Sequence, residues 1–258
     1  MSQMKREGVC HICGNYGPLS FEHIPPRAAF NNRSVIKVKF EEALELGPDG
    51  VAKGPIQQQG AGQYTLCRKC NNDTGAWYGK SFVDWCYQGM DILIRTKGKP
   101  SLIYLNYLFP LRILKQIITM FFSVNTEMFR IQNEELVRFV LNRKAKYLSP
   151  KYRVFVYYNT TGRLRAVGGS GVFNINTGKR SIMSEITYPP FGYVMTLDSE
   201  PPDNRFLEIT HFARYRYNDF IVAELKLPVL PTHLPIPGDY RDKDEIYRNA
   251  GLKPKEGD

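Results

Sequence analysis

Two Cys-x-x-Cys pairs constrain this chain more than any other feature of its sequence. Cys10 and Cys13 form the first pair, and Cys67 and Cys70 form the second. Four thiolates supplied as two short pairs match a tetrahedral zinc site. Redox chemistry is the alternative, but a thioredoxin-like site needs one pair beside a strand–helix unit, not two pairs separated by an irregular stretch. We therefore predict one structural zinc, and we expect the fifth cysteine, Cys86, to be a buried core thiol.

The residues beside the two pairs indicate how each pair is presented. Gly14 directly follows the first pair and permits the tight backbone turn of a zinc knuckle. A helical pattern begins a few residues after the second pair, near Thr74. One pair on a knuckle and one at the start of a helix is the treble-clef arrangement.

The segment between the pairs contains Glu22-His23, followed by Pro25-Pro26. Taken in order, Cys-x-x-Cys, Glu-His-x-x-Pro and Leu-Cys-x-x-Cys-Asn-Asn resemble the HNH endonucleases, and more closely their zinc-braced branch. The resemblance covers about residues 8–80. It implies the ββα-metal fold, in which two strands and a helix surround one catalytic metal.

The resemblance also implies roles for individual residues. His23 matches the histidine that activates water as general base, and Glu22 matches the acidic residue that binds the metal. Asn71, directly after the second pair, matches the other metal ligand. The sequence departs from the pattern in two places: Glu22 stands where Asp is commoner, and no Asn lies near Gln63, where many members have one. Gln63 is therefore only a candidate for orienting the histidine.

The chemistry of these side chains is consistent with that assignment. Phosphodiester hydrolysis needs a base that titrates near neutral pH and a cation beside the developing charge. A carboxylate and an amide oxygen suit Mg²⁺ or Mn²⁺, whereas the thiolates suit zinc. The simpler alternative is that residues 71–73 only cap a helix, with Asp73 as the cap or as a further ligand.

The charge of the chain favours a polyanionic partner. The 258 residues include 35 Lys and Arg and 25 Asp and Glu, which gives a net charge of +10. Nucleic acid is the partner we expect, DNA rather than RNA. A basic cluster with interleaved tyrosines is the predicted contact region for phosphates, with a solvated helix end as the alternative. Its members are Arg138, Arg143, Lys144, Lys146, Lys151 and Arg153.

No apolar run is long enough to span a bilayer, and residues 1–8 carry no apolar leader, so we expect a cytoplasmic protein without a membrane partner.

The predicted fold class is α+β, with three parts. Residues 1–90 form the treble-clef ββα-metal zinc domain, and residues 231–258 form a Pro-rich arm with a short helix at 242–249. Residues 91–230 form an α+β module, helices first and then an antiparallel sheet. Helices are predicted at 77–94, 110–122 and 127–142. Strands are predicted at 35–40, 153–158, 164–167, 172–175, 182–186, 192–197, 206–210 and 220–225.

These features favour a metal-dependent HNH endonuclease that hydrolyses phosphodiester bonds. The alternative is a non-catalytic zinc-containing module that binds nucleic acid or an assembly. A third hypothesis is a toxin or defence effector whose nuclease awaits a trigger. The module at 91–230 would recognise substrate, a partner protein or a second copy of the chain.

Overall fold

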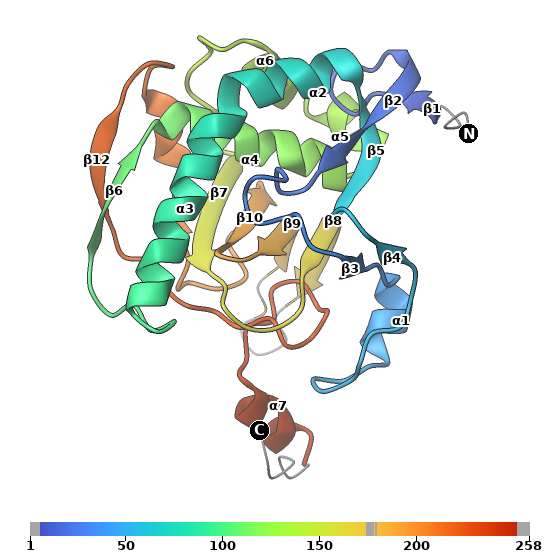
Figure 1. The fold of residues 1–258 in the computed structure, drawn as a ribbon, viewed down its shortest axis with the longest axis vertical. Helices are drawn as coiled ribbons and strands as arrows, with labels where there is room; N and C mark the ends of the chain where they lie inside the picture. Colours follow the sequence, from blue (N-terminus) through green and yellow to red (C-terminus); the bar gives the residue numbers. More distant parts are fainter. Residues whose placement is uncertain (1–5, 174–177, 179, 252–258) are drawn as a thin grey trace.

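A five-stranded antiparallel sheet lies at the centre of the molecule in the computed structural model, which describes residues 6–173, 178 and 180–251 (Figure 1). Every neighbouring pair in this sheet is antiparallel, which confirms the predicted α+β class with antiparallel sheets. Residues 174 and 175 of one predicted strand lie outside the described residues. In spatial order the strands are β11 (Leu207–Glu208), β7 (Tyr152–Tyr158), β10 (Phe191–Leu197), β9 (Arg180–Tyr188) and β8 (Arg165–Phe173).

Both faces of this sheet are buried. Along β7, Val154 and Val156 pack into the main core, whereas Phe155 and Tyr157 belong to a second apolar cluster with Tyr240. Side chains alternate between the two faces of a strand, so these two clusters lie on opposite sides of the sheet. The chain near residue 240 therefore covers the face opposite the main core.

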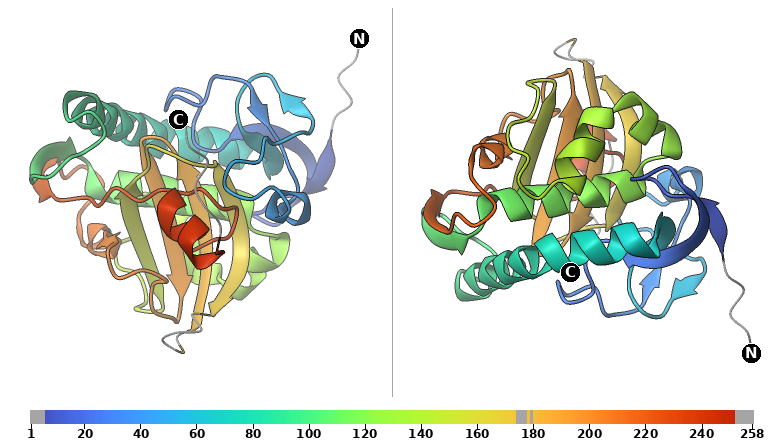
Figure 2. Two further views of the ribbon diagram at one scale, coloured as in Figure 1. Left: turned by 90° about the horizontal axis from the view of Figure 1, so that it is seen from below. Right: turned by 90° about the horizontal axis from the view of Figure 1, so that it is seen from above.

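Helix α4 (Pro110–Val124) is the central helix of the main core. Pro110 occupies its first turn, as predicted, where a missing N–H costs nothing. The helix contacts β8 and β9 on one side and α3 (Lys80–Arg95) on the other. Figure 2 shows α4 layered between α3 and the sheet. This position explains why almost the whole helix is buried, polar residues included.

The helical run that contains α3 begins earlier than predicted. It starts with α2 (Arg68–Thr74) and continues through a π-helical turn (Gly75–Gly79) into α3. The predicted start near residue 77 is wrong because α2 carries polar residues and no apolar periodicity. The second cysteine pair lies at this point, since Cys67 ends β5 and Cys70 lies in the first turn of α2.

The predicted helix at 127–142 is two helices, α5 (Glu127–Gln132) and α6 (Glu134–Leu141). Asn133 separates them with non-helical backbone, and its side chain donates to the carbonyl of Phe129. An Asn side chain that bonds the backbone of the preceding turn competes with helix continuation.

The N-terminal sheet has the order β1-β2-β5 and is antiparallel. Its strands are β1 (Glu7–Val9), β2 (Tyr16–His23) and β5 (Gly62–Cys67), and β5 leads directly into α2. The β2–β5 pair and α2 thus form a strand–strand–helix unit. Leu66 of β5 and Ile12 of the turn between β1 and β2 are buried in one continuous core with α4 and the central sheet.

Smaller elements complete the described chain. The strand predicted at 35–40 is only β3 (Val35–Ile36), because Phe40 already begins α1 (Phe40–Leu44). The remaining elements are β4 (Ile56–Gln57), β6 (Tyr104–Leu108), a 3-10 turn (Thr210–Arg214), β12 (Ile221–Leu225) and α7 (Lys243–Asn249). Among the described helices, none combines the length and apolar character that a bilayer crossing requires.

Candidate metal centre and adjoining cavity

The two cysteine pairs meet at one point, as their spacing predicted. Cys10 and Cys13 come from the turn between β1 and β2, while Cys67 ends β5 and Cys70 lies in α2. The four Sγ atoms all lie within 4.8 Å of one another. The Sγ atoms of Cys13 and Cys67 are 3.8 Å apart, close to the edge of a tetrahedron with Zn–S bonds of about 2.3 Å. The cluster is therefore compatible with a structural zinc.

A hydrogen-bonded backbone turn fixes the position of the first cysteine pair. The N–H of Gly14 donates to the carbonyl of Cys10 at 2.9 Å, and Gly14 has φ of +79°, a left-handed conformation suited to glycine. The hydrogen bond from Cys70 lowers the pKa of Cys10, which favours the thiolate that binds zinc. Cys86 lies outside the cluster, buried in α3, as predicted.

A cavity of about 590 Å³ lies beside this cluster. Glu22 and His23 at the end of β2 line it together with Asn71 of α2. The π-helical turn adds Gly75 and Gly79 to the wall. Glu22 and His23 therefore border the same space as Asn71, which follows them by nearly fifty positions in the sequence.

Glu22 is a buried carboxyl group, only 5% exposed. The hydroxyl of Ser123 in α4 donates to its Oε2 at 2.6 Å. Burial raises the pKa of Glu22 to about 8, and the hydrogen bond from Ser123 opposes that rise. No described Lys or Arg pairs with this carboxylate, so a bound cation would restore its charged form.

Asn71 is held by its amide nitrogen. Nδ2 donates to Ser20 Oγ at 3.1 Å and to the carbonyl of Phe21 at 3.2 Å. No described residue donates a hydrogen bond to Oδ1, which stays free to bind a cation. Asp73 caps no helix, because it lies inside α2 and accepts from Lys69 at 2.6 Å.

His23 is fixed by a backbone carbonyl. Its Nε2 donates to the oxygen of Gln59 at 3.0 Å, so Nδ1 keeps the lone pair that a general base needs. Burial lowers the pKa of His23, and the positive charge of Arg27 lowers it further, against the bond to Gln59. The imidazole is therefore neutral near pH 7.

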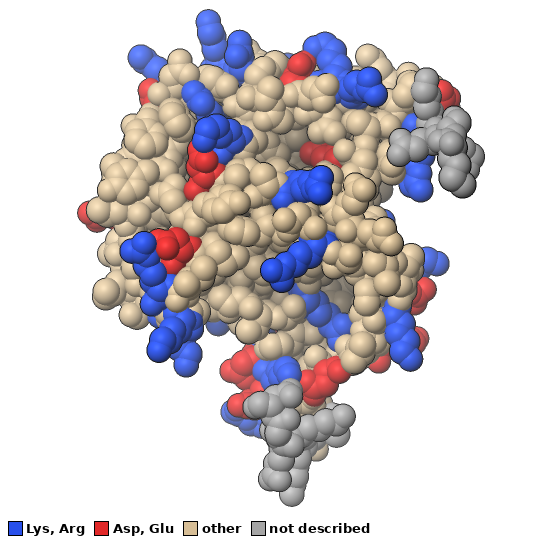
Figure 3. Space-filling model, in the orientation of Figure 1, with Lys and Arg blue, Asp and Glu red and all other residues tan. Residues whose placement is uncertain are grey.

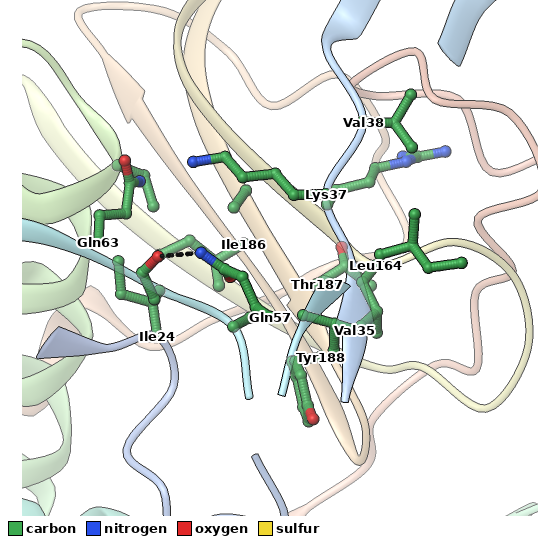
Figure 4. Close-up of a pocket in the computed structure, with 16 residues that line it drawn as sticks. Ile24, Val35, Lys37, Val38, Gln57, Gln63, Leu164, Ile186, Thr187 and Tyr188 are labelled. Carbon is green, nitrogen blue, oxygen red and sulfur yellow. Dashed lines mark hydrogen bonds between the residues drawn. The ribbon is translucent and has the colours of Figure 1, made fainter. Parts of the chain in front are cut away.

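The acceptor for His23 is thus Gln59 and not Gln63. Gln63 borders a different cavity of about 330 Å³, where Figure 4 shows it beside Ile24 at one end and Val35 and Leu164 at the other. A backbone carbonyl carries no residue-specific signal, so the sequence could not identify this partner.

Asn31 is a second residue that sequence analysis missed. It is fully buried, and its Nδ2 donates to the carbonyls of Pro25 and Ala61, both at 2.7 Å. Its Oδ1 accepts from the N–H of Ala61 at 2.7 Å. A Cβ added to Gly60 would lie 2.2 Å from the carbonyl oxygen of Asn31, so only glycine allows this approach. Asn31 thereby joins the turn after His23 to the loop that carries Gln59.

The predicted basic cluster at residues 138–153 is not a set of free cations. Arg153 pairs with Glu200 at 3.0 Å and with Glu208 at 2.9 Å. Arg143 lies over the rings of Trp77 and Tyr217. Figure 3 shows Lys and Arg spread over one face of the molecule rather than gathered in a single patch. Phosphate contact by the cluster stays a prediction.

Comparison with known proteins adds no further assignment: neither the family models, the curated proteins nor the solved structures gave a match.

Proposed function

We propose that the chain is a metal-dependent endonuclease of the HNH type, with a treble-clef zinc site bracing a ββα-metal unit. The observation that carries the proposal is the shared cavity of Glu22, His23 and Asn71, beside the four-cysteine cluster. The β2–β5 pair and α2 supply the strands and helix that such a unit needs.

His23 is the general base in this proposal. Its Nε2–H is engaged by Gln59, and its lowered pKa keeps Nδ1 free to accept a proton from water at neutral pH. The Glu22 carboxylate and the Asn71 amide oxygen are hard ligands that would hold Mg²⁺ or Mn²⁺. When bound, such an ion would stabilise the negative charge that develops on the phosphate and the leaving oxygen.

Nucleic acid is the proposed substrate, with DNA favoured. The net charge of +10 supports attraction to a polyanion, although it does not define a binding face. Arg27 lines the cavity and makes no ion pair with a described residue, so it is available to a phosphate near His23.

The alternative is a zinc-containing module that binds nucleic acid or a partner without cleaving. The raised pKa of Glu22 favours it, because a protonated carboxyl that accepts from Ser123 is a stable structural group without any second metal.

Plasmid cleavage with Mg²⁺ or Mn²⁺ separates the two functions. We expect nicking by the wild type and a loss of about 10²–10⁴-fold in His23→Ala. His211→Ala is the matched control, since burial also lowers the pKa of His211, which does not line the cavity. Equal nicking by His23→Ala and the wild type would overturn the nuclease proposal. Salt-sensitive binding without cleavage in either metal would favour the alternative.

A further inference from the structure

Helix α4 directs a stripe of polar side chains toward the N-terminal unit. Gln116, Thr119 and Ser123 lie at positions i, i+3 and i+7, which share one face of a helix. Ser123 reaches Glu22, and Thr119 bonds within its own helix, to the carbonyl of Lys115. Gln116 lines the cavity of Glu22, His23 and Asn71.

Among the described residues that line the cavity, Gln116 is the one with a buried side-chain atom that has no hydrogen-bond partner. The residue is 3% exposed, and its Oε1 is buried without a hydrogen bond to any described residue. A buried polar group without a partner destabilises the fold, and a side chain such as Met would fill the same volume without that cost. The missing partner therefore points to something that enters the cavity.

The chemistry of the wall identifies the ligand class. Glu22 is buried without a paired Lys or Arg among the described residues, and Asn71 has an unengaged Oδ1. A carboxylate and two amide oxygens around one cavity suit a hard, hydrated divalent cation. They do not suit zinc, which prefers nitrogen and sulfur ligands.

We propose that Gln116 is a positioning residue of the divalent-cation site, whose carboxamide oxygen supports the hydrated ion held by Glu22 and Asn71. The proposal rests on the metal dependence of the proposed function. It makes the site a joint product of the strand–strand–helix unit and α4. Residues 1–90 alone would then hold an incomplete site.

Mn²⁺ binding to the full, zinc-loaded chain tests this directly by calorimetry. We expect Gln116→Met to raise the Kd for Mn²⁺ by about 10–100-fold, the usual effect of removing a supporting partner. Its Tm without added Mn²⁺ should be equal to or higher than that of the wild type, because an unpaired amide has been removed. Gln116→Glu, which keeps an oxygen donor, should retain Mn²⁺ binding.

Gln88→Met is the matched control. Gln88 lies on α3, its side chain bonds the backbone of Tyr107, and it does not line the cavity. Its removal should leave the Kd for Mn²⁺ unchanged. An unchanged Kd in Gln116→Met, or a fall in Tm without any change in Kd, would overturn the proposal.

The outcome separates this inference from the nuclease proposal. A Kd shift in a protein that cleaves no nucleic acid would support the cation site and reject the nuclease. Cleavage with the same Mn²⁺ dependence in wild type and Gln116→Met would support the nuclease and reject the role of Gln116 at the cation site. No Mn²⁺ binding by the wild type would overturn the inference outright.

A measurement on the wild type covers the case in which Gln116→Met fails to fold. Bound Mn²⁺ should broaden the side-chain amide signals of Gln116 in glutamine-labelled protein more strongly than those of Gln88, because the broadening falls steeply with distance from the ion. Unbroadened Gln116 signals would overturn the proposal.

Discussion

Ser123 Oγ donates a 2.6 Å hydrogen bond to Glu22 Oε2 across 101 positions of sequence. The bond joins α4 to the C-terminal end of β2, where the candidate site lies. Burial alone would favour a neutral carboxyl, and this bond partly offsets that effect. A helix outside the strand–strand–helix unit therefore contributes to the charge state of Glu22, against the effect of burial.

The first prediction concerns Glu22 and pH. Its folded pKa is about 8, above the ordinary value of 4.5, so the folded state binds more protons than the unfolded state between these values. The contribution of this carboxyl to the free energy of unfolding is at its full value below about pH 4.5. It falls by up to ~1.4 kcal/mol per pH unit as the pH rises toward 8. Glu22→Gln removes this dependence. Urea unfolding from pH 5 to 8, without added Mg²⁺ or Mn²⁺, measures it.

The comparison of the two proteins isolates Glu22 from other titrating groups. His211, His233 and Lys115 have lowered pKa values and contribute with the opposite sign in both proteins. Parallel stability curves for wild type and Glu22→Gln would show that the carboxyl is not perturbed. Added Mg²⁺ should flatten the wild-type curve, since the ion favours the charged form.

The second prediction concerns the four-cysteine cluster. Purified protein should contain one zinc per chain, and Cys70→Ser should lose it and unfold at a lower temperature, because metal binding to such a site is coupled to folding. Metal analysis and thermal unfolding measure both effects. Cys86→Ala is the control, since that thiol is buried in α3 away from the cluster and should leave the zinc content unchanged. Zinc loss in Cys86→Ala alone would contradict the assignment.

The contrast between the helices shows which information the sequence carries. Pro110 and the apolar residues after it indicated a buried helix, because propensity and burial agree there. The break at Asn133 coincides with a side chain that bonds Phe129, and the early start at Arg68 directly follows Cys67 of the second cysteine pair. Neither is visible as periodicity.

In the candidate site, too, some residues could be predicted from the sequence and others could not. The cysteine spacing indicated the four-cysteine cluster, and the resemblance singled out Glu22, His23 and Asn71, which line one cavity. The groups that orient them were not predictable. Gln59 acts through a backbone carbonyl, and Ser123 acts from a helix whose pattern indicated only a core.

The third prediction concerns Asn31. Asn31→Ala removes three hydrogen bonds of a buried side chain, leaves the carbonyl of Pro25 and the N–H of Ala61 without a partner among the described residues, and should lower stability by ~2–4 kcal/mol. The loop that carries Gln59 would then move relative to His23, so cleavage should fall by at least about tenfold. Denaturant unfolding and plasmid nicking measure the two effects.

Asn32→Ala is the matched control for this position. Asn32 is the exposed neighbour, so its removal should change stability by less than about 0.5 kcal/mol and leave nicking unaltered. Asn31→Asp keeps the acceptor for Ala61 but loses both donations, and an intermediate loss is expected. Full activity in Asn31→Ala would reject a positioning role.

The fourth prediction concerns Arg27 and His23. Burial and the charge of Arg27 both lower the pKa of His23, so removing that charge in Arg27→Gln should raise the pKa toward 6.5 without reaching it. The histidine then stays protonated to a higher pH, and the acid limb of the cleavage profile should shift upward with it. NMR titration of the imidazole, assigned with His23→Ala, measures the pKa without depending on cleavage.

Arg33→Gln is the matched control. Arg33 is an exposed arginine that does not line the cavity, so its replacement should leave the titration of His23 unchanged. A pKa for His23 that stays the same in Arg27→Gln would mean that burial alone sets it, and the proposed influence of Arg27 on the base would be rejected.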